Sequence, residues 1–179
     1  MNPAFLLLSG ALAYEGGMAL SRFRQRRTVY DLAKARAKAV GRPLVVIGDP
    51  DAGLHTRIVR AYDCGDLCVD LGGCPRCSES LVADVHRLPF ASDSAVVYVS
   101  CVLEYVENAP LAMSEVQRVA GSADNLFLVC VQPLSMTSVL YPSAKWSVQE
   151  NGTMKPVSPV TRTAVVGSLL ALAYGAVKR

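Results

Sequence analysis

Charged residues make up only 18% of the sequence and aromatic residues 7%, whereas 51% of it is hydrophobic. This composition excludes an intrinsically disordered chain, because disordered segments combine low hydrophobicity with high charge. At 179 residues the chain has room for one ordinary domain with short appendages but not for a second full domain. It contains no internal repeat or low-complexity tract. We therefore expect one packed core.

Histidine is scarce, with His55 and His86 the only two in the chain. A lone histidine is more often a surface or loop residue than a catalytic base, and we expect this of both. No other residue presents itself as a proton-transfer group. Group transfer by displacement can proceed through proximity and orientation alone. We therefore assign no catalytic residue, and this absence does not exclude an enzyme.

The net charge of +3 conceals a basic stretch between Ser21 and Arg42 that contains a single acid, Asp31. Its eight basic residues are Arg22, Arg24, Arg26, Arg27, Lys34, Arg36, Lys38 and Arg42. Such a stretch can meet nucleic acid or anionic lipid, but it is equally typical of a solvated helix face. Because it lacks a regular interleaving of aromatic residues that could stack bases, nucleic acid is an unlikely partner.

No clean apolar run reaches the roughly 20 residues needed to cross a bilayer. Pro3 to Leu20 is apolar but is divided by Glu15 and the two glycines after it, and Thr163 to Val177 carries no charge. We expect apolar helical segments at both ends, which either contact a membrane or pack on the body. The arginines after Leu20 favour attachment at the cytoplasmic face, with a cytoplasmic protein as the alternative. They follow the apolar run, which argues against a cleaved signal peptide and fits a mitochondrial presequence poorly.

Short apolar runs alternate with helical stretches through the body of the chain. The strands we expect are Leu44–Ile47, Leu67–Leu71, Ser80–Val85, Ala95–Val99 and Asn125–Val131. The helices we expect are Thr28–Val40, Leu54–Tyr62 and Glu104–Val119, and Trp146–Val148 with Met154–Val157 is a candidate strand pair. This alternation predicts an α/β fold with a doubly wound, mostly parallel sheet of fewer than seven strands. We divide the chain into an apolar and basic arm (1–27), a central domain (28–157) and an apolar C-terminal helix (158–179).

Six cysteines leave the redox state open, because they could form three disulfides or remain reduced thiols. Cys101 and Cys130 lie in or beside apolar runs, where a free cysteine behaves as a small hydrophobic residue. Cys74-Pro75-Arg76-Cys77 has the spacing of a zinc knuckle, and Cys64 and Cys68 precede it. The other gaps are tight for an ordinary zinc site. We expect inert, reduced thiols and assign no metal, with structural zinc and a redox pair as alternatives.

The turn after the first expected strand is the first place to look for a ligand, because doubly wound sheets bind ligands where the strand order reverses. That turn runs from Gly48 to Gly53 and contains two aspartates. Asp70 ends the second expected strand about 20 residues later, a position from which a carboxylate can accept hydrogen bonds from ribose hydroxyls. Asp70 can equally be a plain strand-end residue.

The stretch from Asp84 to Val131 resembles class I S-adenosylmethionine (SAM) dependent methyltransferases of the type 11 family. The shared features are an acid before Leu-Pro-Phe, a Leu-Glu turn after the fourth strand and a Glu-x-x-Arg-Val helix. They are carried by Asp84, Leu88 to Phe90, Leu103, Glu104, Glu115, Arg118 and Val119. The resemblance covers about Arg42 to Trp146 and implies a Rossmann-like methyltransferase fold.

The resemblance implies SAM as cofactor and a small or lipid-like methyl acceptor. The cofactor residues it implies are Gly48, Asp49, Gly53, Asp70, Leu71, Asp84, Val85 and Ser100. Two features depart from the family. The glycine motif is degenerate, with Asp49 and Asp51 at glycine positions, and the C-terminal half is truncated. These departures support an alternative, a catalytically inactive methyltransferase-like protein that serves as a structural or membrane-tethered module among assembly partners.

Overall fold

Five parallel strands form the central sheet of the computed structural model, which describes residues 3–52, 59–130, 144–149 and 152–157. The strands are β1 (Leu44–Ile47), β2 (Leu67–Asp70), β3 (Ser80–Val82), β4 (Val96–Ser100) and β5 (Leu126–Val129). Their spatial order is β3-β2-β1-β4-β5, and every neighbouring pair is parallel. This is the order of a doubly wound sheet, so the predicted α/β fold is confirmed.

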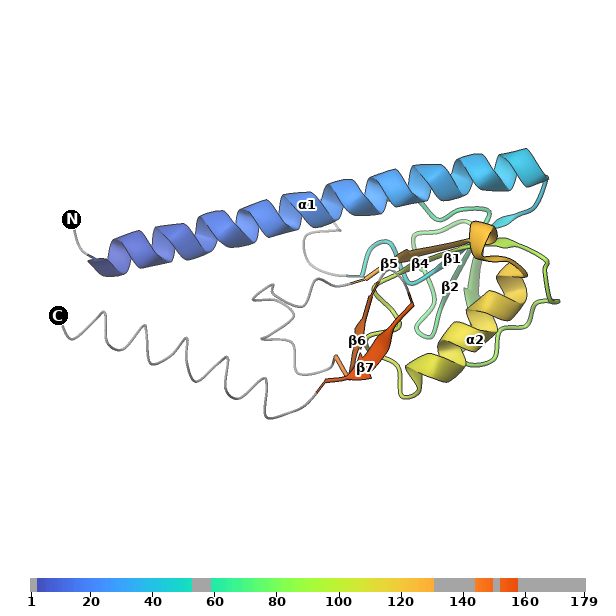
Figure 1. The fold of residues 1–179 in the computed structure, drawn as a ribbon. Coiled ribbons are helices and arrows are strands. Elements are labelled where there is room, and N and C mark those ends of the chain that lie inside the picture. The colour runs from blue at the N-terminus through green and yellow to red at the C-terminus, as the bar shows by residue number, and fades with distance from the viewer. Residues whose placement is uncertain (1–2, 53–58, 131–143, 150–151, 158–179) are drawn as a thin grey trace.

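Helices cover both faces of the sheet, with α1 (Pro3–Val40) on one and α2 (Ala109–Ala120) on the other (Figure 1). Alternate residues of β1 point to opposite faces of the sheet, because successive side chains of a strand point in opposite directions. Leu44 and Val46 pack with residues of α1, whereas Val45 and Ile47 pack with residues of α2. All four are buried, as expected for a central parallel strand.

Helix α1 is a single helix of 38 residues. It runs through Gly16 and Gly17 without interruption, and it extends across the predicted boundary between residues 27 and 28. In the part of the chain that the structure describes, no helix is both long and apolar enough to cross a membrane. The segment Thr163–Val177 lies outside the described residues.

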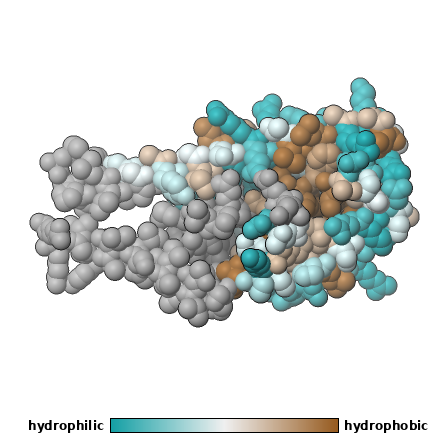
Figure 2. Space-filling view, viewed as in Figure 1, coloured by the Kyte–Doolittle hydropathy of each residue, from teal (hydrophilic) through white to brown (hydrophobic). Residues whose placement is uncertain are grey.

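Three arginines of the basic stretch dock α1 and its C-terminal end on the body. Arg26 donates to Cys101 Sγ at 3.0 Å, and Arg36 donates to Asn125 Oδ1 at 2.9 Å. Arg42, just after the helix, pairs with Asp93. These arginines therefore make contacts within the protein. Figure 2 shows hydrophobic patches among hydrophilic ones on the visible surface. Among the α1 side chains that the structure describes, the exposed large hydrophobic ones are Tyr14, Leu20 and Leu32.

Helix α2 begins at Ala109, five residues later than predicted. Asn108 caps it by accepting a hydrogen bond from the Leu111 N–H at 3.1 Å. Pro110 follows in the first turn, where its missing N–H costs nothing. Gly121 ends the helix in the left-handed conformation. The apolar pattern extends upstream of Asn108, but the cap and the proline decide where the helix starts.

Of three further sets of predictions, two differ from the structure and one is confirmed. The predicted helix Leu54–Tyr62 lies outside the described residues from 54 to 58, and its described end, Val59–Tyr62, is not helical. The predicted strands Ser80–Val85 and Asn125–Val131 are longer than the observed β3 and β5. The predicted final pair is confirmed, because β6 (Trp146–Val148) and β7 (Met154–Pro156) are antiparallel. They form a sheet of their own and do not extend the main one.

Two disulfides connect four of the cysteines, Cys64 to Cys77 and Cys68 to Cys74. The prediction of reduced thiols is therefore wrong for these four. The spacing along the chain could not indicate the pairing, because the partners come together only when the loop after β2 folds back on the sheet. Cys101 and Cys130 are not part of these disulfides, as expected.

Candidate cofactor site

The predicted cofactor residues follow the carboxyl ends of β1, β2, β3 and β4, which share one edge of the sheet. The strand order reverses at β1, because the next strand in sequence lies on one side of it and β4 on the other. The crevice at such a switch point is the usual ligand position in open α/β sheets. The turn after β1 is therefore the centre of the candidate site.

Gly48 begins this turn and must be glycine for two reasons. Its φ of 103° lies in the left-handed region that other residues rarely adopt. A Cβ atom added there would lie 2.7 Å from Val102 Cγ2 and 3.0 Å from the Ser100 carbonyl oxygen. Gly48 thus lets the turn after β1 pack directly against the end of β4.

Asp70 ties the end of β2 to the same turn. Its Oδ2 accepts a hydrogen bond from the Asp49 N–H at 3.1 Å, and its Oδ1 accepts one from the Gly72 N–H at 2.8 Å. A carboxylate offers about four lone-pair positions, so each oxygen retains capacity for a further donor such as a ribose hydroxyl. Asp70 is therefore both a structural brace and an acceptor at the edge of the sheet.

The two aspartates at the glycine positions are held by contacts within the protein. Asp49 Oδ1 accepts a hydrogen bond from the Asp51 N–H at 3.0 Å. Asp51 is only 6% exposed, and its carboxylate pairs with Arg60 and lies 3.6 Å from Arg76. The hydrogen bond to Asp51 raises the pKa of the Arg60 guanidinium. The negative charge of Asp51 is thus neutralised beside the turn.

Sequence reasoning missed the roles of Arg60 and Arg76, because their shared partner Asp51 is apparent only in three dimensions. Arg76 stands in the loop between Cys74 and Cys77, and the Arg60 guanidinium also donates to the Arg76 carbonyl oxygen at 3.4 Å. The disulfides hold this loop next to the turn. The electrostatic balance of the site therefore depends on the cysteine cluster.

Leu71 and Asp84 present side chains to solvent at the ends of β2 and β3. Leu71 is 73% exposed, an unusual state for leucine directly beside a buried strand. Asp84 lies two residues beyond Val82, the residue that pairs with Asp70 in the sheet register. Val85, next to Asp84, is buried in the core on the α2 side. Both side chains are therefore exposed beyond the carboxyl ends of their strands.

His86 connects Asp84 to the start of α2. Its Nδ1 lies 2.6 Å from Asp84 Oδ1, and its Nε2 accepts a hydrogen bond from the Asn108 N–H at 3.3 Å. Because Nε2 accepts this hydrogen bond, the ring proton lies on Nδ1, which donates a hydrogen bond to Asp84 Oδ1. The His86 backbone N–H and its ring together hold the pKa of Asp84 below its ordinary value. The predicted loop histidine is therefore a positioning residue for Asp84.

The Leu-Pro-Phe segment is clamped by the Glu-x-x-Arg pair of α2. Glu115 accepts a hydrogen bond from the Leu88 N–H at 2.8 Å. Arg118 binds Glu115 and donates to the carbonyl oxygens of Phe90 at 2.8 Å and Leu88 at 3.2 Å. The motif residues that carry the family resemblance thus act here as a structural clamp, which fixes the path of the chain after Asp84.

Ser100 is buried, at 5% exposure, and so lies beneath the site. The next residue, Cys101, has a φ of 53°, a conformation that is uncommon for a residue with a side chain. Its Sγ accepts the hydrogen bond from Arg26, and burial raises the pKa of its thiol. The end of β4 therefore faces α1 rather than solvent.

A pocket of about 380 Å³ lies elsewhere, along the edge strand β5. It is lined by residues of β5, the C-terminal half of α2 and the β6–β7 turn, among them Leu126, Gln117 and Gly152. None of the predicted cofactor residues lines it. This pocket is therefore separate from the candidate cofactor site.

The structure places the predicted residues in two groups. Asp49 donates a hydrogen bond to Asp70, and Gly48 directly precedes Asp49, so these three residues lie together at the turn after β1. Asp84 and Val85 follow β3 at the same edge of the sheet. Gly53 lies outside the described residues. Comparisons with known protein families, curated proteins and solved structures found no match to this chain.

Proposed function

We propose that the chain binds SAM at the carboxyl ends of β1, β2 and β3 and transfers its methyl group to a small or lipid-like acceptor. The observation that carries the proposal is the Asp70 carboxylate, held at the switch point by the Asp49 and Gly72 N–H groups with acceptor capacity left on both oxygens. The strand order and the motif residues between Asp84 and Arg118 add support.

The residues present fit the chemical groups of SAM. Asp70 would accept hydrogen bonds from the ribose hydroxyls, and Leu71 and Asp84 would contact the adenine ring and its polar edge. The charge on Asp51 is balanced by Arg60 and Arg76, so the turn can approach the anionic end of the cofactor. When bound, SAM supplies a methyl group on a positively charged sulfur. This chain supplies binding and orientation, which suffice for displacement chemistry.

Calorimetric titration of the full chain with SAM tests this proposal directly. We expect saturable heat with SAM and none with ATP, which shares the adenosine but replaces the amino acid by phosphates. Absence of heat at millimolar SAM overturns the proposal. Equal binding of ATP would assign the site to nucleotides in general.

The second candidate is a methyltransferase-like protein that binds SAM without catalysis and serves as a structural or membrane-tethered module. It is favoured by β6 and β7, which form a separate two-stranded sheet where the family places an antiparallel pair in a seven-stranded sheet. Incubation with methyl-labelled SAM and a panel of amine, hydroxyl and lipid acceptors separates the candidates. Label in an acceptor supports the enzyme, and binding without transfer supports the inactive module.

The lipid-like acceptor is supported by apolar side chains exposed on α1. Tyr14 is 48% exposed and Leu20 is 50% exposed. Cosedimentation with anionic vesicles tests contact between this helix and a lipid surface. We expect the double substitution of Tyr14→Ser and Leu20→Ser to weaken it, while Leu111→Ser, a matched control on α2 at 49% exposure, leaves it unchanged.

A further inference from the structure

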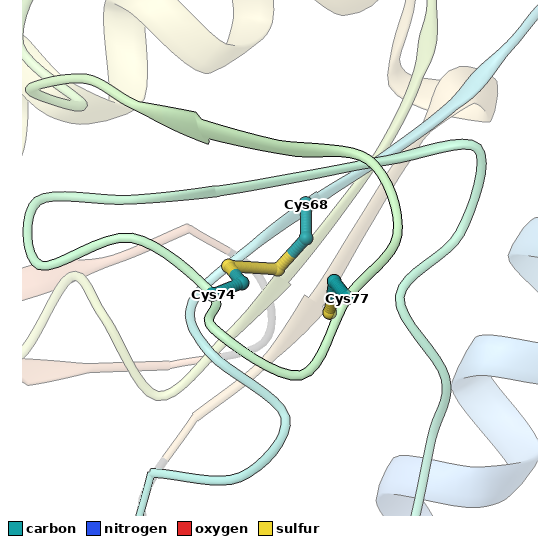
Figure 3. Close-up of side chains that lie close together, drawn as sticks. All are labelled: Cys68, Cys74 and Cys77. Atoms are coloured by element: carbon teal, nitrogen blue, oxygen red, sulfur yellow. A yellow bond between two sulfur atoms is a disulfide. The ribbon is translucent and has the colours of Figure 1, made fainter.

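Four cysteines from three segments converge beside β2. Cys64 precedes the strand, Cys68 lies within it, and Cys74 and Cys77 belong to the loop after it. The sulfur atoms of Cys68, Cys74 and Cys77 all lie within 4.8 Å of one another (Figure 3), and Cys64 Sγ is bonded to Cys77 Sγ. Two unrelated disulfides need not lie next to each other, so the convergence of the four cysteines requires an explanation.

We propose that, in the reduced chain, Cys64, Cys68, Cys74 and Cys77 hold one Zn²⁺ ion in a tetrathiolate site. Structural zinc sites are tetrahedral with Zn–S distances of about 2.3 Å, which places their sulfurs roughly 3.8 Å apart. Three of the sulfurs already lie within a sphere of that order. The Cα atoms of the paired cysteines are 5.7 and 6.2 Å apart, so side-chain rotation separates each sulfur pair without rebuilding the loop.

The donor set favours a soft divalent ion. Cys74-Pro75-Arg76-Cys77 is a zinc-knuckle spacing, and the Cys77 N–H donates to the Cys74 carbonyl oxygen at 3.0 Å, which closes the turn. Among the described residues no carboxylate or histidine joins the group. Thiolate-only sites select zinc and similar soft ions over magnesium or calcium, which prefer oxygen.

Positive charge is already in place beside the sulfurs. Four thiolates and one Zn²⁺ carry a net charge of −2, and Cys68 and Cys74 are almost fully buried. A buried charge is costly unless it is paired. Arg60 donates to Cys64 Sγ at 3.7 Å, and Arg76 lies within the knuckle itself. Of the two arginines that pair with Asp51, Arg60 therefore also contacts a sulfur of the proposed metal site.

The disulfides are then the metal-free, oxidised form of the same site. Each disulfide accepts two electrons and two protons to give two thiols, so two equivalents of a dithiol reductant open both and are themselves oxidised to cyclic disulfides. Zinc binding releases the four thiol protons. In reverse, the tetrathiolate zinc site loses four electrons to give two disulfides and free Zn²⁺, with two equivalents of a two-electron azodicarboxamide oxidant accepting them.

The metal site would also brace the candidate cofactor turn. Cys68 Sγ lies 3.9 Å from the Gly48 carbonyl oxygen, and Arg60 links the cluster to Asp51. Zinc binding to the folded form alone stabilises the fold by mass action. The inference does not depend on SAM, because it rests only on the cysteines and the arginines beside them.

The test is zinc binding by the full chain, purified after treatment with a dithiol and freed of metal. We expect one zinc per chain in competition with a colorimetric chelator, and X-ray absorption should show four sulfur ligands at about 2.3 Å. Cobalt in place of zinc should give the intense sulfur-to-cobalt absorption of a tetrahedral thiolate site. All three readouts use the unmodified chain and so do not depend on whether a variant folds.

Cys74→Ser and Cys77→Ser should lose zinc, whereas Cys101→Ser and Cys130→Ser, which alter the two cysteines outside the disulfides, should retain it. Treatment of the zinc-loaded chain with the azodicarboxamide should release one zinc and give the Cys64–Cys77 and Cys68–Cys74 pairs by mass spectrometry. A fully reduced chain that binds no zinc overturns the proposal. Nitrogen or oxygen ligands in the absorption spectrum also overturn it.

Discussion

The Asp70 carboxylate accepts a hydrogen bond from the Asp49 N–H at 3.1 Å and so joins the end of β2 to the turn after β1. The two residues are 21 positions apart in sequence. The bond uses one position on Oδ2, and the Gly72 N–H uses one on Oδ1. Because the carboxylate is fixed in place before any ligand arrives, binding of a ribose to it loses little free energy to ordering the site.

Asp70→Ala should weaken SAM binding by about 10- to 100-fold. Hydrogen bonds to a charged group contribute about 1.5–3 kcal/mol, and each 1.4 kcal/mol is tenfold in affinity. Calorimetry of the variant and of the wild type provides the measurement. Asp124→Ala is the control, because Asp124 is an exposed aspartate in the short helix before β5. Unchanged affinity in Asp70→Ala would remove Asp70 from the site.

Gly48→Ala should destabilise the fold more than Gly41→Ala. Both glycines have positive φ, which costs a residue with a side chain about 1–2 kcal/mol. Only Gly48 faces crowding, with Val102 Cγ2 at 2.7 Å from an added Cβ, whereas nothing lies within 4 Å at Gly41. Overpacking adds about 1–3 kcal/mol. Urea unfolding of the two variants should therefore differ by that amount, and equal losses would show that the turn yields to the added methyl group.

The central strands β1 and β4 were predictable because each is a short apolar run, and both are buried throughout. Leu44–Ile47 matches β1 at both ends, and the parallel arrangement follows from runs that are apolar on both faces. The start of α2 was not predicted correctly, because apolar spacing continues upstream and only the Asn108 cap ends it. The Asn108 cap thus sets the start of α2, which the apolar periodicity of the sequence does not reveal.

The candidate site was predictable in its acids but not in their partners. Asp70 and Asp84 follow expected strands, so their shared edge could be inferred from the order of elements. Arg60, His86 and the cysteine pairing could not, because each depends on loops that meet only after folding. Sequence therefore located the groups that could face a ligand, while the contacts that hold those groups in place required the structure.

Glu115→Gln should lower stability at neutral pH by about 1–2 kcal/mol, since it replaces a charged acceptor of hydrogen bonds. Arg118, and then the Leu88 N–H, holds the pKa of Glu115 below its ordinary value of 4.5. A lowered pKa stabilises the fold above 4.5, and this contribution is lost as the pH falls through the value in the folded state.

Thermal unfolding of wild type and Glu115→Gln across acid and neutral pH checks this dependence. The two curves should converge well below pH 4.5, where Glu115 of the wild type is protonated. Glu79→Gln, at an exposed glutamate before β3, should behave like the wild type throughout. A constant difference between wild type and Glu115→Gln at every pH would mean that the clamp acts through shape and not through charge.

His86→Ala should raise the pKa of Asp84 part of the way to its ordinary value of 3.8. The backbone N–H of residue 86 remains a donor in the variant, whereas the ring contact of 2.6 Å is lost. Carbon-13 NMR titration of the Asp84 carboxyl group measures the change. The variant also leaves the Asn108 N–H without its acceptor, so hydrogen exchange at the start of α2 should accelerate. Ser114→Ala, on the exposed side of α2, should alter neither quantity. An unchanged Asp84 pKa with faster exchange would confine His86 to capping the helix, whereas both changes together would show that the same ring also lowers the pKa of Asp84.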